Sequence, residues 1–231
     1  MEYLFEAFGD SIQLIFSLDR EIYGIVGRSL FFALTATLMA ALCGVPIGFL
    51  VGTKRFRGKS GLLTLMNTLM ALPTVVIGLL AYGFLSRRAP LGFLDLLFTP
   101  GAVIIGEFIL SLPIIANLTV SAVQAVDPRA ILTAKTLGAG RAMMAWTILM
   151  EARFSLLAAI IAGFGRAVSE VGSAMMLGGN IRSYTRTMTT AIALETSKGE
   201  FGFGLALGFF LLLVVFSINI FFHFLQVKGR Q

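Results

Sequence analysis

The chain has 231 residues, of which 57% are hydrophobic and 13% are charged, and its mean hydropathy is +0.91. Soluble globular domains carry about 25% charged residues, so the composition excludes that class and indicates an all-α integral membrane protein. The formal net charge of +6 requires no nucleic-acid partner, because basic residues commonly gather in the cytoplasmic loops of membrane proteins.

Apolar stretches long enough to cross a bilayer recur along the chain. A spanning helix needs about 20 apolar residues. About five stretches meet this requirement, and we expect spans at residues 29–52, 61–86, 99–126, 146–177 and 201–227. The segment 1–20 includes a short amphipathic stretch and is expected to lie at the membrane interface. The whole chain, 1–231, is expected to form a single membrane domain.

Prolines and a lone cysteine lie inside these spans. Pro46, Pro73 and Pro113 each lack a backbone donor, so they are expected to bend their helices. Cys43 is expected to be a buried packing residue. With one cysteine and one histidine (His223) in the sequence, we expect no metal site and no disulfide within the chain.

Glycines recur at four-residue spacing in two of the expected spans. Gly44, Gly48 and Gly52 do so in the first span, and Gly204 and Gly208 in the last. Rows of small residues let helix backbones approach closely. We expect these rows to serve packing inside the chain rather than to form a dedicated dimer motif.

Basic residues near the ends of the spans predict the orientation. The short loop 54–59 reads KRFRGK and directly joins two spans, which places it in the cytoplasm. The N-terminus is then expected outside, with the loop 127–141 and the C-terminus in the cytoplasm. The side expected to be cytoplasmic receives Lys54, Arg55, Arg57, Lys59, Arg129, Lys135, Arg141, Lys228 and Arg230.

The loop 127–141 has the signals of a short surface helix. Asp127 is a good N-cap and Pro128 suits the first helical position. Strong helix formers fill residues 130–137, and Gly138 with Gly140 supplies a stop. A plain connection between two spans needs neither a cap nor a glycine turn, so the loop is a candidate docking site for a soluble partner.

Ionisable residues also lie inside the expected spans. Arg166 and Glu170 are spaced i, i+4, so they share one helix face and can pair. Glu107 in the third span is a further candidate partner for Arg166. Charged groups within a span are expensive and usually face the bundle interior or a water-filled path. A structural pair and a pair that lines a translocation path both remain open.

The sequence around this loop resembles the membrane permease subunits of ATP-binding-cassette importers. Ala134, Gly138 and Ile148 match the type and spacing of the family's Glu-Ala-Ala to Ile-x-Leu-Pro signature, whereas Leu132 and Glu151 stand where the family has Glu and Pro. The resemblance implies the type I importer architecture, with a cytoplasmic coupling helix between the third and fourth spans. It also implies the residues that contact the ATPase: Thr133, Ala134, Lys135, Gly138, Ala139 and Arg141.

A second stretch, residues 163–195, resembles the oxyanion branch of this family. Its run SEVGSAMM followed by GGNI is most similar to tungstate-type permeases, with molybdate and sulfate permeases as alternatives. The ionisable residues within the spans and the polar stretch that follows them predict a translocation path or gate at Glu107, Arg166, Ser169, Glu170, Asn180 and Thr187. The hydroxyl-rich stretch 183–190 suits a tetrahedral dianion chemically, but docking and gating are the expected roles because a separate external protein usually selects the cargo.

The resemblance implies that the chain takes part in transport by alternating access. The expected partners are a cytoplasmic ATPase in two copies, an extracytoplasmic oxyanion-binding protein, a second copy of this chain and the lipid of a prokaryotic cytoplasmic membrane. ATP and Mg²⁺ would be held by the ATPase, and no cofactor or catalytic residue is expected in this chain. The competing classes are an intramembrane enzyme and a membrane scaffold. The enzyme is disfavoured because neighbouring Ser169 and Glu170 do not face each other on a helix.

Overall fold

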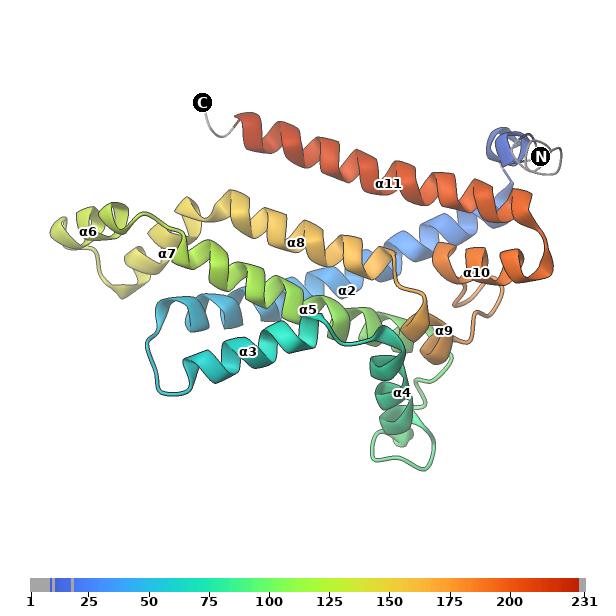
Figure 1. Ribbon diagram of the computed structural model, residues 1–231, viewed down its shortest axis with the longest axis horizontal. Coiled ribbons are helices and arrows are strands. Elements are labelled where there is room, and N and C mark those ends of the chain that lie inside the picture. Colours follow the sequence, from blue (N-terminus) through green and yellow to red (C-terminus); the bar gives the residue numbers. More distant parts are fainter. Residues whose placement is uncertain (1–8, 10, 18, 229–231) are drawn as a thin grey trace.

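The computed structural model describes residues 9, 11–17 and 19–228, and the described chain is built from helices and short connections (Figure 1). The predicted interfacial segment lies partly outside this range, and within it residues 11–16 are helical. The further elements are α2 (Arg20–Thr53), α3 (Lys59–Met70), α4 (Thr74–Leu85), the 3₁₀ turn η1 (Gly92–Leu94), α5 (Pro100–Gln124), α6 (Pro128–Thr136), α7 (Arg141–Glu151), α8 (Arg153–Val168), α9 (Gly172–Gly178), α10 (Met188–Lys198) and α11 (Phe201–Lys228).

Three of the helices are long and apolar enough to cross a membrane unbroken. They are α2, α5 and α11, which correspond to the first, third and fifth predicted spans. The pairs α3–α4 and α7–α8 raise the number of spans to five if each bent pair counts as one. The predicted all-α fold with about five spans is thereby confirmed. Figure 1 shows α2, α5, α8 and α11 lying along the long axis of the molecule.

The second predicted span, 61–86, is not one continuous helix. It divides into α3 and α4, which meet at 97°. Pro73 is the N-cap of α4 with ψ of 129°, an extended conformation that ends the preceding helix. Packing fixes the direction of α4: a Cβ on Gly78 would stand 2.9 Å from the Cα of Ser173 in α9. Pro46 and Pro113, in contrast, lie inside α2 and α5, each of which remains a single helix.

The fourth predicted span, 146–177, also differs from the structure. Helix α7 meets α8 at 66°, and α9 is a separate short helix. Glu151 and Arg153 flank the bend, and both are exposed. Charged side chains are costly in hydrocarbon, so the bend keeps them at the polar end while α8 continues into the apolar layer.

The glycine row of α2 is an internal packing seam, as predicted. A Cβ on Gly48 would stand 2.3 Å from the carbonyl oxygen of Ala116 in α5, so only glycine permits this approach. Gly44 and Gly52 face α5 at slightly larger distances. Cys43, on another face of α2, is exposed, so the prediction that it is buried was wrong. The reason is geometric: its face of α2 has no helix packed against it within the described chain.

The segments predicted to share one side of the membrane lie at one end of the molecule. Figure 1 shows the α2–α3 connection, α6 and the last turns of α11 at that end. The start of α2 and the connection from α9 to α10 lie at the opposite end. Arg230 lies outside the described residues. The arrangement agrees with the predicted pattern of loops and sets the coupling helix far from the polar loop 179–187.

Candidate functional site

The loop predicted to couple the chain to an ATPase forms the helix that its sequence signals indicate. An oxygen of the Asp127 side chain accepts a hydrogen bond from the backbone N–H of Arg129 at 2.8 Å, and Pro128 is the first helical residue. Gly138 ends the helix with φ of +79°, a conformation that favours glycine. Helix α6 contains no fully buried residue; Ile131 packs against the apolar cluster that includes Val126 and Ile148, and the side of α6 away from this cluster is available to a partner.

The predicted coupling residues lie together on α6 and the turn that follows it. Thr133, Lys135, Gly138 and Arg141 are exposed, whereas Ala134 and Ala139 are half-buried. Lys135 of α6, Ala139 of the turn and Arg141 at the start of α7 line a groove of about 320 Å³ together with further residues of α2 and α7. The groove lies between α6, the start of α7 and the end of α2.

Two apolar side chains of this surface were not among the predicted coupling residues. Leu132 is 60% exposed and Leu137 is 82% exposed. Exposed leucines on an otherwise polar short helix are typical of a surface that a partner covers. Leu132 stands where the family signature has Glu. The sequence contained a signal for its role, because it is an apolar residue on a short helix between an N-cap and a terminal glycine.

A pair of charged residues lies inside the apolar part of the molecule. Nη1 of Arg166 lies 3.2 Å from Oε2 of Glu170, so the predicted i, i+4 pair is formed. Oε1 of Glu170 accepts a hydrogen bond from the backbone N–H of Ser173 at 2.8 Å, and its backbone carbonyl accepts one from the Thr189 hydroxyl at 2.5 Å. Glu170 is only 2% exposed, and it therefore ties α8, α9 and α10 together.

Glu107 lies near this pair but does not join it by a salt bridge. It is 2% exposed, its Oε2 has no hydrogen-bond partner, and its carboxyl group interacts electrostatically with that of Glu170. Within the described chain Arg166 pairs with Glu170 and not with Glu107. Ser169 is exposed, and its hydroxyl donates to the carbonyl of Gly165 at 2.7 Å. The structure thus brings together three of the predicted path residues: Glu107, Arg166 and Glu170.

The remaining predicted path residues belong to the connection between α9 and α10. Asn180 donates through Nδ2 to the carbonyl of Thr190 at 3.3 Å. Thr187 caps α10 in a reciprocal arrangement with Thr190. The hydroxyl of Thr185 donates to the carbonyl of Gly178 at 2.6 Å. These buried hydroxyls serve the loop itself, which leaves fewer of them for an anion than the sequence suggested.

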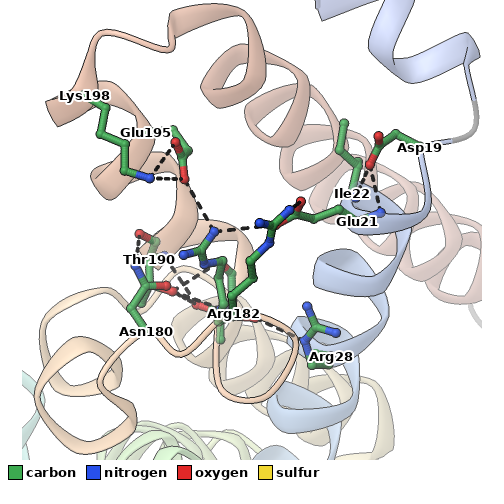
Figure 2. Close-up of polar contacts among 11 residues, drawn as sticks. Asp19, Glu21, Ile22, Arg28, Asn180, Arg182, Thr190, Glu195 and Lys198 are labelled. Atoms are coloured by element: carbon green, nitrogen blue, oxygen red, sulfur yellow. Dashed lines mark hydrogen bonds and ion pairs between the residues drawn. The ribbon is translucent and has the colours of Figure 1, made fainter.

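A polar cluster at this end joins the start of α2 to the loop and to α10 (Figure 2). Nε and Nη2 of Arg182 both donate to the carboxylate of Glu21, and these bonds raise the pKa of Arg182 above its ordinary value. Nη1 of Arg186 lies 3.4 Å from an oxygen of Glu195, which also receives Lys198 at 3.1 Å. Glu21 and Glu195 were not predicted site residues. The pairing of Glu21 with Arg182 joins positions far apart in the chain, whereas Glu195 and Lys198 are three residues apart on one helix, a spacing that the sequence shows.

Within the described residues no group of three or more histidine, cysteine, aspartate or glutamate side chains could hold a metal ion. The side chain of His223 lies outside the described part of the structure.

Comparison with known proteins places the chain among transport proteins. Residues 44–229 match the family described as binding-protein-dependent transport system inner membrane component. A protein from Peptoclostridium acidaminophilum named tungstate uptake system permease protein TupB is 39% identical, covering 98% of this chain and 99% of the relative. A protein of the same name from Campylobacter jejuni is 37% identical, covering 98% and 95%.

A solved structure shares the fold. The crystal structure of an amino acid ABC transporter with histidines aligns with a TM-score of 0.70 at 17% identity, covering 92% of this chain and 95% of that one. The likeness extends over the broken spans as well as the long helices, since it covers nearly the whole chain. The chain therefore belongs to the family of inner membrane components of binding-protein-dependent transport systems, the permease subunits of ATP-binding-cassette importers.

Proposed function

We propose that the chain is the permease subunit of an importer for tungstate, with molybdate and sulfate as the alternative cargoes. Two relatives that match nearly end to end, at 39% and 37% identity, carry the name of tungstate uptake permeases, and this is the observation that carries the proposal. The resemblance of residues 163–195 to tungstate-type permeases supports the same cargo. Tungstate and molybdate are nearly identical in shape and charge, so an uptake measurement is needed to separate them.

Membership in the family implies an ATPase partner and an external binding protein. Hydrolysis of ATP takes place on that separate subunit, and this chain is a membrane subunit rather than an enzyme. We propose that ATP and Mg²⁺ are bound there, that two copies of the ATPase contact two copies of this chain, and that the permease dimer encloses the pore. The N-terminus would be outside and α6 in the cytoplasm.

The proposed mechanism is alternating access driven through α6. Closure of the two ATPases on ATP draws the two docked coupling helices together. Thr133 and Lys135 on the exposed face of α6, with Arg141 at the start of α7, make the contact, and the groove against α2 and α7 transmits the movement. The cytoplasmic ends of the spans then close while the outer ends open to a loaded binding protein. This movement would open and close a gate formed by Arg166, Glu170 and the loop that ends at Thr187.

The cargo is tested by elemental analysis of cells with and without the gene. Cells are exposed to trace tungstate or molybdate, each with and without excess sulfate, and the retained metal is measured by mass spectrometry. We expect tungsten to accumulate only with the gene and to resist competition by sulfate. Gene-dependent molybdenum uptake alone, or uptake abolished by sulfate, would replace tungstate by the corresponding alternative. A scaffold protein would show no difference and would not co-purify with an ATPase.

The coupling role is tested by Gly138→Arg. No atom lies within 4 Å of a Cβ at Gly138, so the fold should tolerate the side chain, with a backbone strain of about 1–2 kcal/mol. The long cation would stand in the docking surface, and we expect uptake to fall at least about tenfold while the amount of folded permease is retained. Co-purification of the ATPase should fall in parallel.

Gly58→Arg is the matched control for this variant. Gly58 is also in the left-handed region, with φ of +90°, and no atom lies within 4 Å of a Cβ there. It belongs to the α2–α3 connection, which Figure 1 shows at the same end of the molecule as α6. It carries the same strain and added charge but is outside α6. We expect normal uptake from it. If the two variants support equal uptake, α6 is not part of the surface that docks the ATPase.

A further inference from the structure

A second hollow lies at the end of the molecule opposite α6. The first turns of α2 and the loop after α9 enclose a volume of about 880 Å³, which is lined by Arg20, Glu21, Gly24, Arg28, Arg182 and Ser183 among others. This volume is larger than a tetrahedral oxyanion group requires. The proposed transport mechanism makes no use of it.

The sequence of α2 places two arginines on one wall of the hollow. Arg20, Gly24 and Arg28 are spaced at i, i+4 and i+8, so they lie along one face of the helix. Gly24 has no side chain between the two arginines. A Cβ at this position would stand 3.3 Å from Nη1 of Arg28, so the Arg28 guanidinium lies over Gly24 and a larger side chain there would displace it.

The hollow carries an excess of positive charge. Its lining includes three arginines and one acid, Glu21. Both carboxylate oxygens of Glu21 accept hydrogen bonds from Arg182, and Nη1 of Arg186 lies 3.6 Å away, so this acid is already neutralised. Nε of Arg28 donates to the carbonyl of Arg186 at 3.5 Å. Within the described residues the terminal nitrogens of Arg28 and the guanidinium of Arg20 form no hydrogen bond or salt bridge, and Arg28 interacts with the side chains of Glu21 and Arg186 only electrostatically over a longer distance.

The opposite wall is held rigidly by its own hydrogen bonds. The carbonyl of Ile181 accepts from the backbone N–H groups of Tyr184, Thr185 and Arg186, and the N–H of Ile181 donates to the Thr185 hydroxyl at 2.9 Å. Arg182 and Ser183 are therefore presented on a fixed turn, as Figure 2 shows for Arg182 beside Glu21 and Arg28. Groups fixed in this way lose little conformational entropy when they bind a ligand.

We propose that this hollow binds a tetrahedral oxyanion group between Arg20 and Arg28, beside the Arg182–Glu21 pair. Guanidinium groups match the oxygens of phosphate-like anions in paired hydrogen bonds, and the Ser183 hydroxyl can add one more. The apolar part of α2 begins at Ser29, so the hollow lies at the level expected for lipid headgroups. The group is supplied either by the phosphate of a bound lipid or by a free oxyanion. The proposal does not depend on which cargo the permease carries.

The test compares the permease, purified with its ATPase, with the double variant Arg20→Gln/Arg28→Gln. Retained phospholipids are counted by native mass spectrometry, and free oxyanion binding is measured by equilibrium dialysis with radiolabelled phosphate and sulfate and with tungstate. We expect the double variant to weaken binding at least about tenfold in one of the two measurements. A loss in the first identifies a lipid phosphate, and a loss in the second identifies a free oxyanion.

Two further proteins keep the result interpretable. Arg87→Gln/Arg88→Gln removes the same charge from exposed positions that do not line the hollow, and it should bind as the unmodified protein does. Gly24→Leu displaces the Arg28 guanidinium without changing any charge, and it should weaken binding as the double variant does. Equal binding by all four proteins, or no bound oxyanion group in either measurement, would overturn the proposal.

Discussion

Replacing Gly48 by alanine is expected to lower the free energy of unfolding by about 3 kcal/mol and to abolish uptake. A Cβ at Gly48 would stand 2.3 Å from the carbonyl oxygen of Ala116 and 2.6 Å from Cβ of Thr119. Neither atom can turn away as the end of a flexible side chain can, so α2 and α5 would have to separate. Thermal unfolding of the detergent-solubilised permease, followed by loss of the monodisperse peak in size-exclusion chromatography, measures the effect.

Gly27→Ala is the control on the same helix. No atom lies within 4 Å of a Cβ at Gly27, and alanine favours a helix over glycine by about 1 kcal/mol, so this variant should be slightly more stable. The same substitution therefore has opposite signs at two positions of α2. Gly44→Ala and Gly52→Ala, whose closest contacts would be 3.2 and 3.1 Å, should fall between them. Equal stability of the Gly48 and Gly27 variants would contradict the assignment of the glycine row of α2 as a packing seam against α5.

The elements whose signals are local in the chain could be predicted from the sequence. The cap of α6 at Asp127, the proline at its first position and the glycine at its end involve neighbouring residues, and all are present in the structure. The ends of α5 and α11 follow from apolar length in the same way. The Arg166–Glu170 pair was predictable because both residues lie on one turn of chain.

Features that depend on packing could not be read in this way. Pro73 predicts a bend, but the 97° angle depends on how closely α4 packs on α9 at Gly78. The break at Ala152 had a signal, since Glu151 and Arg153 interrupt the apolar run, but its angle is again set by tertiary contacts. The contact of Glu21 with Arg182 joins residues that only the completed fold brings together. The exposure of Cys43 follows from which face of α2 meets α5.

Glu170→Gln is expected to destabilise the permease by about 2–3 kcal/mol, whereas Glu107→Gln should be neutral or slightly stabilising. The first change leaves Arg166, whose side chain is 29% exposed, without its ion-pair partner, although the amide oxygen can still accept the N–H of Ser173. The second removes a buried carboxyl group with an unpartnered oxygen near Glu170. The same unfolding measurement applies. An equal loss of stability in both variants would contradict the assignment of Glu170 as the ion-pair partner of Arg166.

The double variant Arg166→Met/Glu170→Gln decides whether the pair is structural or lines the path. Removing both charges leaves no buried ion unpaired, so stability should recover relative to Glu170→Gln alone. If the pair only holds α8 against α9 and α10, uptake should recover with it. If Arg166 also guides the anion, the double variant should fold and bind the ATPase but transport at least about tenfold more slowly. We expect the second result, because Arg166 is partly exposed while Glu170 is buried, so the guanidinium is the member that an anion can reach.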